Sequence, residues 1–142
     1  MRLHYEVGAD FTHAGEAAGD VKRRLRQMGF PSGAVRRLTI AMYEAELNMA
    51  IHAGGGAADV EITPRCLVAV LADRGPGIPD VELAMREGWS TAPDTVRSLG
   101  FGAGMGLPNI KKYADELNIQ TAVGAGTTLT ITVYTEPADG GA

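Results

Sequence analysis

The sequence is poor in several features that would by themselves assign a protein to a class. Its 142 residues include a single cysteine, Cys66, so no disulfide can form within the chain and a reducing compartment is expected. The longest apolar run, 66–72, is far too short to span a membrane, and the N-terminal segment lacks the apolar stretch of a signal peptide. The net charge of −4 argues against a general nucleic-acid binder, which needs clustered basic residues. We therefore expect a cytoplasmic protein that contacts neither nucleic acid nor membrane.

Glycine, in contrast, is abundant. The chain has 19 glycines, and they cluster at 54–56, 75–77, 100–106 and 124–126 without forming a low-complexity tract. Each glycine costs conformational entropy on folding, so such clusters need a physical reason. Clusters between periodic segments indicate several tight backbone sites within one fold.

Hydrophobic periodicity predicts one domain over residues 1–134, followed by a disordered tail at 135–142. Strands are predicted at 2–8, 57–63, 66–72, 117–123 and 127–134, and helices at 13–29, 33–53, 79–86 and 107–116. The segment 66–72 is nearly all apolar and is therefore expected at the centre of the sheet, whereas 87–106 is aperiodic and is expected to form a long functional loop. This order predicts an α/β two-layer sandwich, with helices on one face of a mixed, largely antiparallel sheet.

The predicted helix at 33–53 carries a polar row between two apolar stripes. The stripes consist of Val35, Leu38, Met42, Ala45 and Met49, and of Ile40, Leu47 and Ile51. Glu44, Asn48 and His52 lie between them at intervals of four residues, whereas Glu46 is expected on the solvated side of the helix. One glutamate of this helix is therefore expected inside the apolar arc and the other outside it.

A carboxylate in the apolar arc must be hydrogen-bonded, paired or used, because burying it alone is expensive. One interpretation is a structural ion pair of Glu44 with Arg37. The other is a functional pair facing one cavity, in which Glu44 accepts a proton and the Asn48 side-chain oxygen binds a hard cation such as magnesium. His52 is assigned no catalytic role.

Two glycine-rich segments add further candidates. In "ADRGPGI", residues 72–78, Asp73 ends a buried strand beside Gly75 and Gly77, an arrangement that suits an amine-bearing planar ligand such as adenine, although plain turns look similar. In "GFGAGMGLPNIKKYADE", residues 100–116, alternating glycines precede a helix, where backbone N–H groups and the helix dipole attract anions. The spacing fits neither a Walker loop nor a Rossmann fingerprint.

In this order the three segments resemble the N, G1 and G2 boxes of the GHKL ATP-binding superfamily, whose fold is the Bergerat fold. The matching motifs are Glu44-x-x-x-Asn48, Asp73-x-Gly75-x-Gly77 and Gly102-x-Gly104-x-Gly106-Leu107. The stretch "GTTLTITV", 126–133, is similar to the last box of the family, in which a threonine helps to hold adenine. Thr127 is preferred to Thr128 because it shares a strand face with Leu129 and Ile131.

The resemblance implies ATP and Mg²⁺ as cofactors and a role for each matching residue. Glu44 would be the general base and Asn48 the magnesium ligand, while Asp73 would accept the adenine amino group. The remaining nucleotide contacts implied by the motifs are Gly75, Gly77, Ile78, Gly102, Gly104, Met105, Gly106, Leu107 and Thr127. Arg97, in the segment that resembles the family's lid, is a weaker candidate for the γ-phosphate.

The length of the chain is similar to that of stand-alone anti-sigma-factor serine kinases and switch kinases of bacteria. That resemblance implies a serine/threonine kinase of transcription regulation whose substrate is a STAS-domain anti-anti-sigma-type protein. A sigma factor or a phosphatase as a further partner, and a homodimer, are left open. The alternative is a nucleotide-dependent switch module that captures its partner without transferring phosphate.

Overall fold

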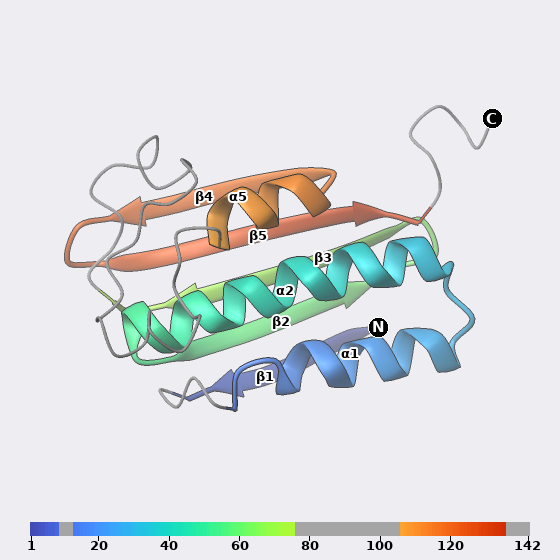
Figure 1. Cartoon of the computed structure of the whole chain (residues 1–142), viewed down its shortest axis with the longest axis horizontal. Coiled ribbons are helices and arrows are strands. Elements are labelled where there is room, and N and C mark those ends of the chain that lie inside the picture. The colour runs from blue at the N-terminus through green and yellow to red at the C-terminus, as the bar shows by residue number, and fades with distance from the viewer. Residues whose placement is uncertain (9–12, 76–105, 136–142) are drawn as a thin grey trace.

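In the part of the chain that the structure describes, one layer is a five-stranded sheet, and the other consists of helices α1, α2 and α5, which lie on the same face of that sheet (Figure 1). This computed structural model describes residues 1–8, 13–75 and 106–135. Its elements are β1 (Arg2–Val7), α1 (Glu16–Gln27), α2 (Ser32–Ala53), β2 (Gly56–Ile62), β3 (Cys66–Asp73), α5 (Gly106–Tyr113), β4 (Glu116–Ala122) and β5 (Gly126–Tyr134). The strand order is β1-β2-β3-β5-β4, and each of the four pairings is antiparallel.

The expected two-layer α/β sandwich is confirmed, and β3 is the central strand as its apolar run predicts. The inward face of β3 carries Leu67, Ala69 and Leu71, each at most 1% exposed. α2 lies across the middle of the sheet, between α1 and α5, and contacts both helices (Figure 1). The predicted helix at 79–86, the loop at 87–105 and the tail from 136 lie outside the described residues.

The helix predicted at 107–116 ends earlier, at Tyr113, and Asp115 lies outside it, where its side chain binds other parts of the chain. Its carboxylate accepts hydrogen bonds from the Arg37 guanidinium at 2.8 Å and from the backbone N–H of Tyr134 at 2.7 Å. Arg37 also donates to the backbone carbonyl of Tyr134 at 3.1 Å. Asp115 therefore joins α2 to β5 at the point where the chain turns from α5 into β4.

The prediction that Glu46 faces solvent is wrong. Its side chain is 2% exposed, and Thr39 and Ala50 on the same side of α2 are also buried. The Glu46 carboxylate accepts hydrogen bonds from the backbone N–H groups of Gly15, Ala17 and Ala18 at 2.9, 3.3 and 2.6 Å. The prediction failed because the spacing of residues within α2 does not reveal that α1 packs against this side of the helix.

The first turn of α1 needs an acceptor because the first N–H groups of any helix have no partner within it. The residue before the helix is Gly15, which has no side chain to provide a cap. Glu46 of α2 provides the cap instead, and its negative charge lies at the positive end of the α1 dipole. Burial raises the pKa of the Glu46 carboxyl, and the three N–H groups offset part of that rise.

We predict that Glu46→Gln lowers the free energy of unfolding by about 1–3 kcal/mol, because an amide presents only one acceptor oxygen to three buried N–H groups. Urea unfolding followed by circular dichroism measures the difference. Glu16→Gln is the matched control, since Glu16 lies in the first turn of α1, the turn that Glu46 caps, but its side chain is 77% exposed. It should cost less than about 1 kcal/mol. Equal losses in the two variants would contradict the capping role.

Candidate functional site

Asp73 ends β3 and connects two further parts of the chain through one carboxylate oxygen. Its Oδ1 accepts hydrogen bonds from the backbone N–H of Gly75 at 2.9 Å and from the backbone N–H of Thr127 at 3.1 Å. Asp73 thus fixes the turn that follows β3 and the beginning of β5. Neither bond uses Oδ2, so this oxygen has lone pairs to offer to an amine donor of a ligand.

Glycines allow the backbone to close around Asp73. Gly126 has a φ of +97°, and a Cβ placed on it would lie 2.2 Å from the backbone oxygen of Asp73. Gly56 is the partner of Asp73 in the β2–β3 register, and a Cβ there would lie 2.3 Å from the carbonyl oxygen of Ala72. Neither glycine was among the candidate site residues. The glycine clusters at 54–56 and 124–126 were the signal for them.

Thr127 has the orientation expected from its strand face. It is 8% exposed, whereas Thr128 is half-buried on the opposite face of β5. The Thr127 hydroxyl is hydrogen-bonded to the hydroxyl of Thr121 on β4 at 2.9 Å. The structure therefore brings Thr127 and Asp73 together, although their contact with adenine remains a prediction.

Glu44 and Asn48 lie half-buried on α2, one turn apart. Burial raises the pKa of the Glu44 carboxyl, and a hydrogen bond from the Asn109 side chain offsets part of the rise. Arg37 is not the partner of Glu44, because its guanidinium binds Asp115 and Tyr134. The ion-pair interpretation that named Arg37 is therefore wrong.

The contact of Asn109 with Glu44 was missed by the sequence analysis. Asn109 lies on α5, directly after the glycine-rich stretch, and α5 packs against α2. Ile110, next to it, is fully buried in the core. An amide within the apolar surroundings of "GLPNIKK" was the available signal, because a half-buried amide needs a hydrogen-bond partner.

α2 connects the Glu44 region to the Asp73 region. A Cβ placed on Gly75 would lie 2.5 Å from the Cβ of Ala53, the last residue of α2. The end of α2 therefore abuts the turn that follows Asp73. Between Glu44 and Ala53 the helix rises by about 13 Å. A ligand that lay along this helix with one end at the Asp73 turn would therefore reach Glu44 only if it were about 13 Å long.

Several candidate residues lie outside the described part of the chain: Gly77, Ile78, Arg97, Gly102, Gly104 and Met105. Gly106 is the first residue of α5. The side chain of Leu107 is 8% exposed and belongs to the hydrophobic core, so it anchors the start of α5.

Magnesium fits the donors on α2. Among the described residues no group of three or more His, Cys, Asp or Glu side chains could hold a metal ion. Magnesium, however, is commonly held by only one or two protein ligands together with substrate phosphates and water. Asn48 is half-buried and offers one hard oxygen donor of this kind, one turn from a carboxylate.

The fold agrees with what comparison to known proteins shows. Residues 7–133 match the histidine kinase-like ATPase domain. The chain therefore belongs to the histidine kinase-like ATPase family, and it is of the GHKL type that includes anti-sigma-factor kinases. ATP is the nucleotide that this family implies.

Two similar proteins carry names from sigma-factor regulation. The chain is 32% identical over 106 residues to the serine/threonine-protein kinase RsbT of Bacillus subtilis, covering 72% of this chain and 74% of RsbT. It is also 32% identical over 91 residues to the anti-sigma F factor of Pasteuria penetrans, covering 59% of this chain and 57% of that protein.

Solved structures share the fold at lower identity. The structure of the RsbU and RsbW domains of Rv1364c from Mycobacterium tuberculosis superposes with a TM-score of 0.65 at 18% identity, over 97% of this chain and 34% of that one. The mycobacterial sensor histidine kinase MprB superposes with a TM-score of 0.53 at 20% identity, over 94% of this chain and 97% of that one.

In the described part of the chain, no helix has the length and apolar character needed to cross a membrane.

We predict that Asp73→Asn weakens ATP binding about 10- to 100-fold, because the loss of a charge-assisted hydrogen bond costs about 1.5–3 kcal/mol. Isothermal titration calorimetry with ATP and Mg²⁺ measures the affinity, and thermal unfolding shows whether the variant remains folded. Asp59→Asn is the control, because Asp59 is a carboxylate of the same sheet that pairs with His4 on the face away from the helices. If ATP binds Asp73→Asn as tightly as the parent, Asp73 does not recognise adenine.

Proposed function

We propose that the chain is an ATP-dependent protein serine/threonine kinase of bacterial sigma-factor regulation, and that it phosphorylates a STAS-domain antagonist protein. The observation that carries the proposal is the half-buried Glu44, one turn from Asn48 on the helix that leads to the Asp73 turn. Similarity to a named serine/threonine kinase and to a named anti-sigma factor supports the kinase class and the pathway.

Binding begins with adenine at the β3–β5 junction. Asp73 Oδ2 accepts a hydrogen bond from the adenine amino group, while Oδ1 stays occupied by the N–H groups of Gly75 and Thr127. The contacts made by Oδ1 hold the carboxylate in position before the nucleotide arrives. This preorganisation reduces the entropy that ATP binding must overcome.

Phosphate transfer takes place beside α2. A serine hydroxyl of the partner attacks the γ-phosphorus, an O–P bond forms to the serine, and the bond between the γ-phosphorus and the bridging oxygen of ADP breaks. The Glu44 carboxylate accepts the hydroxyl proton. Asn48 would hold the magnesium ion, which neutralises charge on the phosphates when it is bound. Asn109 orients the Glu44 carboxylate from the neighbouring helix α5.

The environment of Glu44 suits a general base. Burial raises the pKa of its carboxyl above the ordinary value of 4.5, and a base accepts a proton more effectively as its pKa approaches the working pH. The hydrogen bond from Asn109 favours the ionised form and limits the rise. Glu44 thereby gains basicity while it still has a partner that stabilises its charge.

A nucleotide-dependent binding module is the second candidate function. The similarity to a protein named as an anti-sigma factor favours it, since that name describes binding to a sigma factor. Such a module would use the same Asp73 region without needing a base at Glu44. For either function, the proposed partner is a STAS-domain protein, a sigma factor or a phosphatase, and the proposed location is the cytoplasm. A homodimer is left open, and no contact with nucleic acid or a membrane is proposed.

We predict that Glu44→Gln slows phosphate transfer about 10²- to 10⁴-fold, the usual contribution of a general base. ATP affinity should change little, because adenine is recognised elsewhere. The assay is transfer of labelled phosphate from ATP to a purified STAS-domain protein encoded beside this chain. The rate of the parent should fall in acid with a midpoint above pH 4.5, because protonated Glu44 cannot accept a proton.

Glu61→Gln serves as the control for this variant, since Glu61 is an exposed glutamate on β2 that pairs with Arg2. It should transfer phosphate at the parent's rate. If the parent protein binds ATP and the partner but never labels the partner, the kinase proposal fails and the binding module remains. If Glu44→Gln transfers as fast as the parent, the protein is a kinase with a different base.

A further inference from the structure

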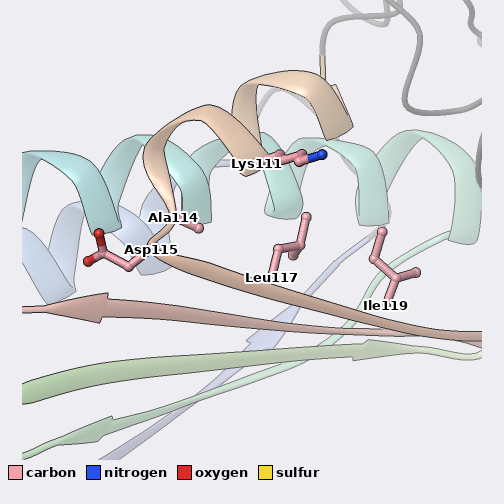
Figure 2. Close-up of a pocket in the computed structure, with 5 residues that line it drawn as sticks. All are labelled: Lys111, Ala114, Asp115, Leu117 and Ile119. Carbon is pink, nitrogen blue, oxygen red and sulfur yellow. The ribbon is translucent and has the colours of Figure 1, made fainter. Parts of the chain in front are cut away.

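Helix α5 and strand β4 enclose a groove along one edge of the sheet (Figure 2). Its volume is about 330 Å³, and its lining consists of Lys111, Ala114, Asp115, Leu117 and Ile119. Leu117 and Ile119 alternate along β4, point toward the helix layer, and are half-buried beside the core. Leu117 and Ile119 form an apolar floor, and Lys111 and Asp115 contribute the charged groups of the groove.

The groove lies beside a strand edge that has no partner in the described residues. β4 pairs with β5 on one side and is the last strand of the sheet. Such an edge presents a row of free N–H and C=O groups to any extended chain that approaches it. The seven residue pairs between β4 and β5 are consecutive, so no bulge bends this edge away.

The two edges of the sheet differ in their protection. β1, at the other edge, carries Arg2, His4 and Glu6 on its exposed face, and the first two are ion-paired to acidic residues of β2. β4 has no lysine, arginine or proline, and its single charged residue is Glu116 at its first position. Natural proteins commonly block edge pairing with charges or proline. β4 has little of this protection, which makes it the edge open to pairing.

The charge available in the groove is positive. Both carboxylate oxygens of Asp115 are occupied, one by the Arg37 guanidinium and the other by the N–H of Tyr134. Lys111 extends from α5 above Leu117 and Ile119 (Figure 2), and within the described residues no acidic group pairs with it. Lys111 is exposed, so a carboxylate on an occupant can reach it and would meet a complementary charge.

We propose that the α5–β4 groove binds an extended, acidic segment of a partner protein. The segment adds a sixth strand beside β4, packs alternate apolar side chains on Leu117 and Ile119, and places a carboxylate against Lys111. A second copy of this chain fits less well, because pairing β4 with its own copy would bring the Lys111 of each copy to the same seam. Like charges at such a seam oppose association.

The test begins with selection of phage-displayed random seven-residue peptides on the immobilised full chain. Enriched peptides should contain an acidic residue together with apolar residues at alternate positions. A labelled enriched peptide should then bind the free protein in fluorescence anisotropy and shift the backbone amide resonances of residues 116–122. The proposal would be overturned if no acidic peptides with apolar residues at alternate positions were enriched, or if the amide shifts were confined to another region.

Charge reversal at the groove provides the sharper arm of the test. Lys111→Glu should weaken peptide binding about tenfold or more at low salt, and a peptide in which lysine replaces the acidic residue should regain affinity for this variant. Lys112→Glu on the same helix is the matched control and should change affinity at most about threefold. Equal effects of the two variants would overturn the role of Lys111. If the free chain dimerises and Lys111→Ala, which removes the like charges at the seam, strengthens the dimer, the edge belongs to a second copy of this chain instead.

Discussion

The cap that the buried Glu46 carboxylate provides to the first turn of α1 fixes the arrangement of the helix layer. This carboxylate accepts three backbone hydrogen bonds where α1 has no capping side chain of its own. The cap determines which side of α2 faces α1. Successive residues of a helix are about 100° apart, so Glu44 and Glu46, two residues apart, point in nearly opposite directions. Glu44 therefore faces α5 and Asn109. The two glutamates of one helix thus have separate tasks, one in holding the fold and one in the proposed chemistry.

Asp73 uses the same physical device beside the C-terminal end of α2. A carboxylate again satisfies backbone N–H groups that have no partner in regular structure, and in doing so it connects segments distant in sequence. Gly56 and Gly126 remove the side chains that would prevent this approach. Ala53 brings the end of α2 against the same turn. A single helix therefore spans the distance from the Asp73 turn to Glu44, and the proposed nucleotide site extends along it.

Patterns within single elements predicted much of this arrangement. The apolar run of β3 gave its central place, and alternation along β5 gave the buried face of Thr127, since both depend only on local spacing. Glu46 and Arg37 were misjudged because their partners, the α1 backbone and Asp115, lie far away in the sequence. The contact of Asn109 with Glu44 was missed for the same reason. Spacing locates an acidic residue on a helix face but does not identify which other element covers that face.

The most direct test of this account is a crystal structure of the chain with Mg²⁺ and a non-hydrolysable ATP analogue. The account predicts that the adenine amino group donates to Asp73 and that the γ-phosphate lies within reach of Glu44, with Asn48 on the metal ion. An analogue bound away from the Asp73 turn, or a γ-phosphate directed away from α2, would contradict it.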